Sequence, residues 1–286
     1  MVSINISLVG SNGDTINLSD SYSDYVLKTG VLGFGVPPVE VRISASASDG
    51  GVWRSTKRGI RDVDLPITIL GSDRADLEDK LRRLANLVQD TNGPTKIVAS
   101  YGDGTSFQIF AHYVGGADAA YGDDANGVMA NWVLSFQAPQ PFWESVTATN
   151  YVLQQTGGGR GLLPQLTKLK LAGQYGFGDV TLTNPGDVPA YPVWAIKGPC
   201  TSATFSSNGV GFTYSATILS TDTITIDTAA GTVKDQAGVN RYANLAAAPK
   251  LFPIQPGTQT VTVSAPGATS ATQVLGNIKP RREVIH

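Results

Sequence analysis

Side chains that most often carry out acid–base, nucleophilic or metal chemistry are scarce in this chain. Its 286 residues include two histidines, His112 and His286, and one cysteine, Cys200. A serine triad would have to use His112, and no Gly-x-Ser-x-Gly nucleophile motif is present. One cysteine and two histidines do not make a structural zinc site of the usual kind. We therefore expect a protein that is not an enzyme, with no catalytic residue, no metal site and no cofactor.

Carboxylates are the remaining candidates for chemistry. Asp62 and Asp64 stand two residues apart on one face of an expected strand, where they could form an acid–base pair. Nothing nearby supports a hydrolase built from carboxylates alone, and we interpret this face as a solvated strand edge. Asp118, Asp123 and Asp124 share a loop, but their spacing does not match that of a calcium-binding loop.

Residues 45–59 form a long stretch that is rich in Ser, Gly and Asp and departs from core patterning. A loop of this length inside a compact domain is usually functional or disordered. Its second half carries our candidate subunit-interface residues, Trp53, Arg54, Lys57 and Arg58, because a tryptophan among cations is typical of an interface anchor. Two main interpretations remain open, a solvated flap and an arm that reaches a neighbouring subunit, with nucleic-acid contact a minor third.

The stretch NWVLSFQAPQPFWES, residues 131–145, has the pattern of a strand with one buried face. Prolines end the strand, because proline cannot donate to a ladder and restricts the residue before it. Phe142 and Trp143 follow at once, and Trp132 lies near the start of the strand. We expect these three aromatic residues to form a domain junction, with an ordinary hydrophobic corner of a core as the alternative.

Alternation of apolar and polar residues between turn signals predicts a mainly β protein. Residues 63–69 are a clear strand, and Asn12-Gly13 predicts a hairpin turn after another. The single convincing helix is residues 72–89, because an apolar stripe recurs there with helical spacing. Ser72 or Asp73 can cap it.

The length and the change of pattern along the chain predict two domains. Residues 1–145 are expected to form a β-sandwich or barrel-like domain with the one helix, and residues 146–286 a second β-sandwich or jelly roll of short, evenly spaced strands. The glycine-rich run at 156–161 is expected to be a linker or a loop tip. The polar, basic residues that end the chain are interpreted as a solvated edge.

A sugar platform is one function that a β-sandwich could carry. Trp194, Phe212 and Tyr214 share strand faces with other apolar residues, so we assign them to the core. Tyr175 and Phe177, in a glycine-rich stretch, are the weak remaining candidates for glycan contact.

The bulk composition excludes several classes of partner. The formal net charge of −2 gives no global attraction for nucleic acid or an anionic membrane. No signal peptide pattern is present, and no apolar run approaches the roughly 18 residues of a membrane span. A single cysteine excludes a disulfide within the chain. We expect no specific nucleic-acid binding, no membrane insertion and synthesis in a cytoplasm.

Several motifs together resemble one family. They are the strand end SFQAPQPFW at 135–143, then TNPGDVPAYPVWAIKGP at 183–199, TITIDTAAGTVKD at 223–235, NRYANL at 240–245 and LFPIQPGTQTV at 251–261. In this order they resemble the distal tail proteins of phages with long non-contractile tails (siphophages), and they span most of the chain.

The resemblance implies a structural virion protein of the tail tip or baseplate, made in the bacterial host cytoplasm. It implies that the first domain forms a hexameric ring that extends the tail tube. It also implies that the second domain projects outward, in some relatives as a galectin-like or carbohydrate-module-like fold. Partners would be the tail-tube protein, the tape-measure protein and the tail-tip hub or fibre proteins. The alternative is a glycan-binding module for the host surface, and a third possibility is a cell-wall hydrolase.

Overall fold

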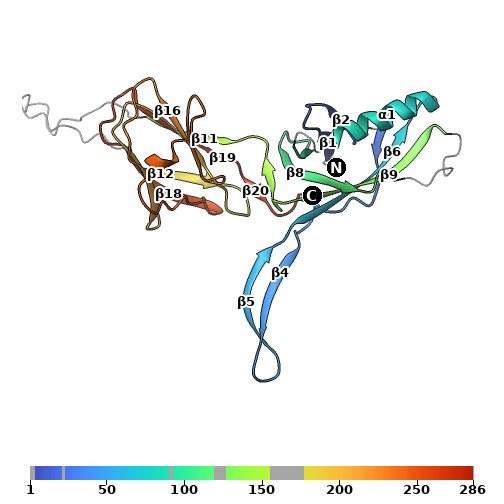
Figure 1. The fold of residues 1–286 in the computed structure, drawn as a ribbon, viewed down its shortest axis with the longest axis horizontal. Helices are drawn as coiled ribbons and strands as arrows, with labels where there is room; N and C mark the ends of the chain where they lie inside the picture. Colours follow the sequence, from blue (N-terminus) through green and yellow to red (C-terminus); the bar gives the residue numbers. More distant parts are fainter. Residues whose placement is uncertain (1–3, 21–22, 90–92, 119–126, 155–176, 286) are drawn as a thin grey trace, which may run out of the picture. The chain divides into compact units, whose positions relative to one another are not determined.

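The structure, a computed structural model, describes residues 4–20, 23–89, 93–118, 127–154 and 177–285. The protein is mainly β, as the sequence predicts. It divides into two compact units (Figure 1). The first unit comprises residues 1–147 together with residues 281–286, and the second comprises residues 148–280.

The first unit is built on a nine-stranded sheet that is nearly closed on itself like a barrel. Its main path runs β2-β1-β7-β8-β9-β6-β3, with β10 and β20 attached beside β8. All its pairings are antiparallel. The strands are β1 (Asn5–Val9), β2 (Thr15–Asn17), β3 (Tyr25–Leu27), β6 (Arg61–Leu70), β7 (Thr95–Ser100), β8 (Ser106–Gly115), β9 (Met129–Ala138), β10 (Trp143–Ser145) and β20 (Arg281–Arg282).

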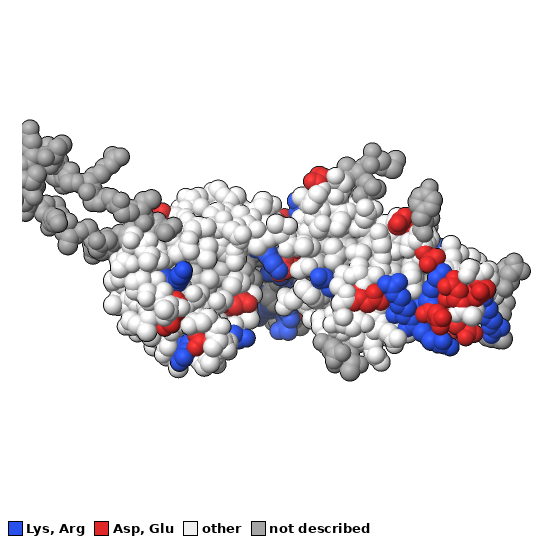
Figure 2. All heavy atoms as spheres, turned by 90° about the horizontal axis from the view of Figure 1, so that it is seen from above, with Lys and Arg blue, Asp and Glu red and all other residues white. Residues whose placement is uncertain are grey.

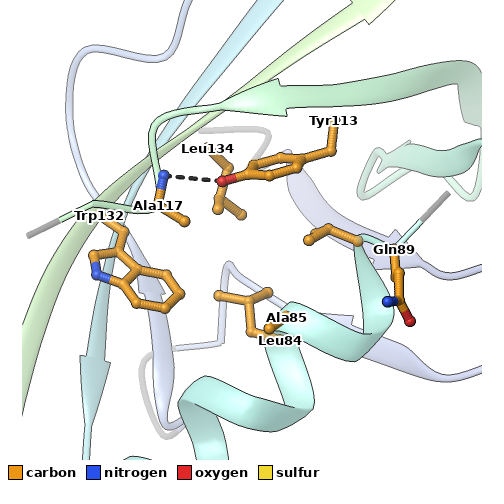
Figure 3. A pocket seen from close by; sticks show the side chains of 8 residues that line it. Leu84, Ala85, Gln89, Tyr113, Ala117, Trp132 and Leu134 are labelled. Atoms are coloured by element: carbon orange, nitrogen blue, oxygen red, sulfur yellow. Dashed lines mark hydrogen bonds between the residues drawn. The ribbon is translucent and has the colours of Figure 1, made fainter.

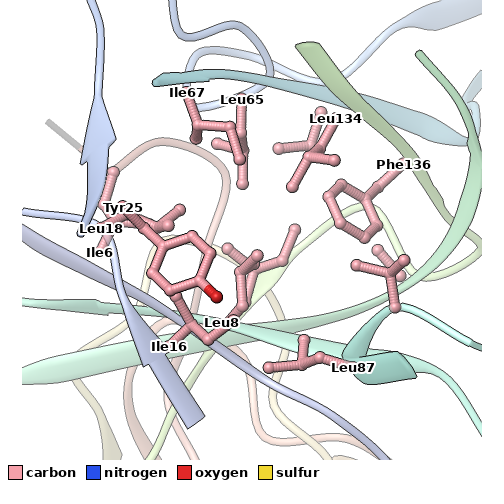
Figure 4. Close-up of a cluster of buried hydrophobic side chains, with 14 of the residues drawn as sticks. Ile6, Leu8, Ile16, Leu18, Tyr25, Leu65, Ile67, Leu87, Leu134 and Phe136 are labelled. Carbon is pink, nitrogen blue, oxygen red and sulfur yellow. The ribbon is translucent and has the colours of Figure 1, made fainter. Parts of the chain in front are cut away.

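The core of the first unit lies where the apolar faces of these strands meet helix α1 (Arg74–Leu87) (Figure 4). The long strands β6 and β9 pair over their full length, with Leu65 opposite Leu134. Both side chains are fully buried, because alternate residues of a strand point to the same side. The alternating pattern of residues 63–69 therefore gives the expected inward face.

Helix α1 begins and ends inside the predicted range of 72–89. Asp73 caps it, since its side chain accepts a hydrogen bond from the backbone N–H of Asp76. Leu77 and Leu84 of the predicted stripe are buried. Helix α1 is too short and too polar to cross a membrane, and no other helix among the described residues could do so.

The stretch 45–59 is not a loop, contrary to expectation. Strand β4 (Val39–Ala45) and strand β5 (Gly51–Arg58) form a separate two-stranded antiparallel hairpin that projects from the first unit (Figure 1). The sequence does not predict β5, because almost all its side chains are exposed. No buried face therefore imposes an alternating pattern on this strand.

The second unit is a sandwich of two antiparallel sheets, as predicted. Its five-stranded sheet runs β11-β19-β13-β16-β17 and its four-stranded sheet runs β12-β18-β14-β15. The first sheet comprises β11 (Thr149–Gln154), β13 (Val193–Lys197), β16 (Thr223–Asp227), β17 (Thr232–Asp235) and β19 (Gln273–Ile278). The second comprises β12 (Gly178–Asn184), β14 (Ala203–Ser207), β15 (Val210–Tyr214) and β18 (Gly257–Ser264), and a short 3-10 helix spans Tyr242–Asn244.

Aromatic side chains fill the space between these two sheets. Trp194 of β13 contacts Phe205 of β14 across the sandwich, with ring centroids 4.7 Å apart. Phe205 stacks on Phe212, 5.0 Å away. Trp194, Phe212 and Tyr214 are all buried, which confirms their assignment to the core.

The unit boundary differs from the predicted ranges at the end of the chain. Residues 281–285, which we expected to be a solvated edge of the second domain, belong to the first unit through β20. Residues 156–161 lie outside the described residues. They fall between β11 and β12, which both belong to the second unit, so they do not connect the two units.

Candidate subunit-interface hairpin

The β4–β5 hairpin carries an apolar face that nothing in the chain covers among the described residues. Cross-strand pairing places Trp53 opposite Ile43, and Val41 lies two residues before Ile43 on the same face. Ile43 is 65% exposed and Trp53 is 62% exposed. The indole N–H of Trp53 donates to the Thr56 hydroxyl at 2.9 Å, which holds the ring against the strand. Exposed apolar residues gathered in this way are typical of a surface that binds a partner.

The opposite face of the hairpin is mostly polar, although it also carries the exposed Val52 opposite Ser44. Arg54 occupies an irregularity in the pairing of β4 with β5, and its Nε donates to the Ser44 hydroxyl at 3.0 Å. Lys57 pairs with Glu40 across the strands. The four predicted interface residues therefore do not form one patch, since Arg54 and Lys57 lie on this polar face and Trp53 lies on the apolar one.

The hairpin joins the body of the first unit at residues 33–38 and 58–61, which we call the hairpin base. Arg61 is its central side chain and is 1% exposed. Its guanidinium donates to four backbone carbonyls from three separate segments. They are the carbonyls of Gly33, Gly35, Pro141 and Glu283. Burial lowers the pKa of Arg61 to about 10, and the nearby Glu283 carboxylate acts in the opposite direction.

Arg58, the fourth predicted interface residue, is also part of this base. Its Nε and Nη2 both donate to Oε1 of Glu283, at 2.9 and 2.6 Å. Gly33 on the other side of the base has φ of 91°, and a Cβ there would collide with the backbone of Asp62 and Val63. A glycine is therefore required where the chain enters the hairpin.

Of the three predicted junction residues, Phe142 and Trp143 lie beside the hairpin base. Trp143 is fully buried, and its ring meets Phe34 edge-on at 5.1 Å. The Arg281 guanidinium lies over the Phe142 ring, 4.8 Å from its centroid. These aromatics pack the first unit around the point where the chain continues to β11.

Trp132 lies in other surroundings. It lines an apolar pocket of about 440 Å³ between helix α1 and strands β8 and β9, with Leu84, Leu134 and Tyr113 among its neighbours (Figure 3). The Tyr113 hydroxyl accepts a hydrogen bond from the backbone N–H of Ala117 at the pocket wall. The structure therefore places Trp132 beside the helix, in a pocket that neither Phe142 nor Trp143 lines.

The structure does not bring the weak candidates for glycan contact, Tyr175 and Phe177, together in a site among the described residues. Phe177 is half-buried and packs against the core of the second unit, and Tyr175 lies outside the described residues. A shallow pocket of about 150 Å³ lies elsewhere in this unit, between the β14–β15 hairpin and residues 246–249.

Among the described residues, no group of three or more His, Cys, Asp or Glu is placed to hold a metal ion. Asp118 is exposed, whereas Asp123 and Asp124 fall outside the described residues. Charged side chains gather on the part of the first unit that carries α1, where Lys80 bridges Asp76 and Asp24 (Figure 2).

No family model and no curated protein matches this sequence. Solved structures do match. The Dit protein of phage SPP1, described as a paradigm of the hub adsorption apparatus in phages that infect Gram-positive bacteria, aligns with a TM-score of 0.66 at 13% identity, over 96% of this chain and 98% of that chain. The fold is that of Dit. A chain of the phage p2 baseplate, in its activated conformation with Ca, also matches, with a TM-score of 0.58 at 10% identity over 99% of this chain and all of that chain.

The Dit fold therefore extends over both units of this chain. The resemblance to distal tail proteins that the sequence motifs predict is confirmed at the level of the fold. The motifs alone could not locate the hairpin or its base, because neither has a local sequence signature.

Proposed function

We propose that this chain is a structural hub protein of the distal tail of a phage with a long, non-contractile tail. The observation that carries the proposal is the fold match to a tail hub protein, which covers 96% of this chain and 98% of the other. The scarcity of catalytic side chains fits a structural role. The protein acts in the virion after synthesis in the host cytoplasm.

The first unit forms a hexameric ring in this proposal, and the hairpin links neighbouring subunits. A closed ring needs one patch on each subunit to meet a different patch on the next. A projecting hairpin with an exposed apolar face around Trp53 suits one half of such a contact. Removal of this face from water would supply the association energy, at about 25 cal/mol for each Å² of apolar surface buried.

The second unit projects from this ring, and the partners are the tail-tube, tape-measure and tail-tip hub or fibre proteins. The alternative function, a glycan-binding module, has less support. The aromatic residues of the sandwich are mostly in its core, and the described surface offers Tyr191 and Tyr242 as its more exposed rings. A glycan array probed with the full chain tests this alternative directly.

The mass of the protein in solution tests the ring. Light scattering after size exclusion should give six times the mass of the 30.0 kDa chain, and negative-stain images should show closed rings. A protein that stays monomeric alone should form the ring when it is produced with its tail-tube and hub partners. If it remains monomeric in their presence, the proposal is wrong.

A further inference from the structure

The last described residues of the chain return to the first unit and fill part of its structure. Strand β20 pairs with β10, with Arg282 opposite Trp143. Ile285 is fully buried, and its backbone N–H donates to the carbonyl of Phe34 at 3.1 Å. We call residues 281–285 the C-terminal segment. It is an internal part of the first unit, although it follows the whole second unit in sequence.

Glu283 of the C-terminal segment contacts the outgoing side of the hairpin base in two ways. Its carboxylate accepts both hydrogen bonds from Arg58, the last residue of β5. Its backbone carbonyl accepts a hydrogen bond of 2.6 Å from Nη2 of Arg61, the first residue of β6. One residue therefore holds the point at which the chain leaves the hairpin and enters the main sheet.

The incoming side of the hairpin base is held by the same group of residues. Arg61 donates through Nη1 to the carbonyls of Gly33 and Gly35. The residue between them, Phe34, accepts from the Ile285 N–H and packs its ring on Trp143, which lies opposite Arg282. The C-terminal segment therefore contacts both the incoming and the outgoing side of the hairpin base.

We propose that the C-terminal segment fixes the base of the β4–β5 hairpin, so that the hairpin is held in a defined direction only in a chain that contains residues 281–285. Residues 281–285 follow directly on the second unit, which ends at Pro280. The first unit therefore cannot complete its hairpin base until the second unit has been synthesised. The buried Arg61 would otherwise lack one of its carbonyl partners, and the space that Ile285 fills would be empty.

Within the proposed function, this arrangement would keep unfinished chains out of the ring. That consequence rests on the proposed function, whereas order at the hairpin base does not depend on any assembly. A measurement on the monomeric or assembled full-length chain can therefore test the C-terminal segment separately.

Hydrogen exchange of the full-length protein, followed by mass spectrometry, provides this test. We expect Ile285→Ala and Glu283→Ala each to speed exchange in peptides that span residues 33–41 and 56–63, by about tenfold or more for Ile285→Ala, because local opening would no longer require those contacts to break together. Peptides from β7 should change much less in both variants. A truncation within residues 281–285 should also speed exchange in the peptides that span residues 33–41 and 56–63.

Two matched controls distinguish this effect from general loss of stability. Ile97→Ala removes an equally buried isoleucine from β7, and Glu78→Ala removes an exposed carboxylate that pairs with Arg74 and Arg82 on α1. Ile97→Ala should speed exchange across the sheet, with no preference for the hairpin base. Glu78→Ala should leave the base unchanged.

Unchanged exchange at the hairpin base in both segment variants would overturn the proposal, as would a uniform rise like that of Ile97→Ala. If Ile285→Ala does not fold, Glu283→Ala decides the question alone, since its side chain is partly exposed and its loss should leave the core intact. A wild-type protein that never forms a ring would refute the proposed function while leaving this result standing.

Discussion

Arg61 shows how a single buried cation can hold several segments together. Four backbone carbonyls surround its guanidinium, and they come from residues far apart in sequence. Hydrogen bonds to a charged donor are stronger than neutral ones, and each carbonyl left without a donor in a buried site costs free energy. The residue therefore stabilises the hairpin base through polar contacts rather than through hydrophobic packing.

We expect Arg61→Met to lower the free energy of unfolding by about 2–4 kcal/mol, because a side chain of similar length leaves these carbonyls without a donor. Urea unfolding followed by circular dichroism measures the change. Arg42→Met, at an exposed position on the polar face of the hairpin, is the matched control and should stay within about 0.5 kcal/mol of the wild type. Equal stabilities for the two variants would contradict the role of Arg61.

The ionisation of Asp76, in the first turn of α1, should make the stability of the protein depend on pH. The Lys80 ammonium, 2.7 Å from its carboxylate, lowers the pKa of Asp76 to about 2, and hydrogen bonds from the Ser72 N–H and hydroxyl act in the same direction. Because the folded pKa is below the ordinary value of 3.8, this contribution to stability is present above about pH 4 and is lost as pH falls towards 2.

The urea midpoints of the wild type and Asp76→Asn should therefore differ at neutral pH and converge between about pH 4 and pH 2. An NMR titration of the Asp76 carboxylate checks the lowered pKa directly. Asp49→Asn, at the tip of the hairpin, is the control, and its midpoint should follow that of the wild type throughout. A constant difference between wild type and Asp76→Asn across this range would refute the assignment.

The hairpin is the element that most sets this molecule apart from a plain β domain. A two-stranded ribbon is marginally stable by itself in water, so its base and any partner on its apolar face must supply the order. The two faces of the hairpin make different predictions for assembly. The face with Trp53, Ile43 and Val41 offers most of the apolar surface of the hairpin, and Val52 is the exposed apolar residue of the opposite face.

We expect Trp53→Ala to shift the protein from ring towards monomer, because loss of a central aromatic anchor typically costs about 2 kcal/mol or more at each contact. Light scattering after size exclusion measures the shift, and circular dichroism confirms that the fold is intact. Tyr242→Ala removes another exposed ring, in the second unit, and should leave assembly unchanged.

Arg54→Ala separates the two faces of the hairpin, since Arg54 lies on the polar side. It should weaken assembly less than Trp53→Ala does. If Trp53→Ala assembles like the wild type, the hairpin is a solvated flap and the ring must be held by strand edges or the helix.

At the scale of the whole molecule, the two units are connected by two chain segments. One leads from β10 into β11 and the other leads from β19 into β20. In the first unit these segments pair with each other, as β10 with β20. The chain therefore leaves and re-enters the first unit at one place.

This connectivity changes what proteolysis should show. From the sequence we predict proteolytic cleavage in the glycine-rich run 157–161, with fragments of about 16 and 13 kDa. The fragments should stay together in native size exclusion, because β11 pairs with β19 and β10 pairs with β20 across the cut. Separation of the fragments without denaturant would show that these pairings do not hold the nicked protein.

Much of the secondary structure could be predicted from local sequence. The strand at 63–69, the helix within 72–89 and the aromatic core of the second unit follow from periodicity, because burial on one side of a regular element repeats at a fixed spacing. Ion pairs within the helix follow in part. Glu78 pairs with Arg82, but Arg83 pairs with Asp14, which lies 69 residues away and could not be found from helical spacing.

The candidate site depended on tertiary structure. The residue types in the sequence pointed to Trp53 and its neighbouring cations. Only the pairing of β4 with β5 showed that they lie on two faces, and only the contact with Glu283 assigned Arg58 to the base. Tertiary structure also decided the burial of Arg61 and the pairing of residues 281–282 with β10. The physical reason is the distance along the sequence between the residues that come together. Periodicity reports which face of an element is buried, but pairing across 139 residues, as between Trp143 and Arg282, leaves no pattern in either segment.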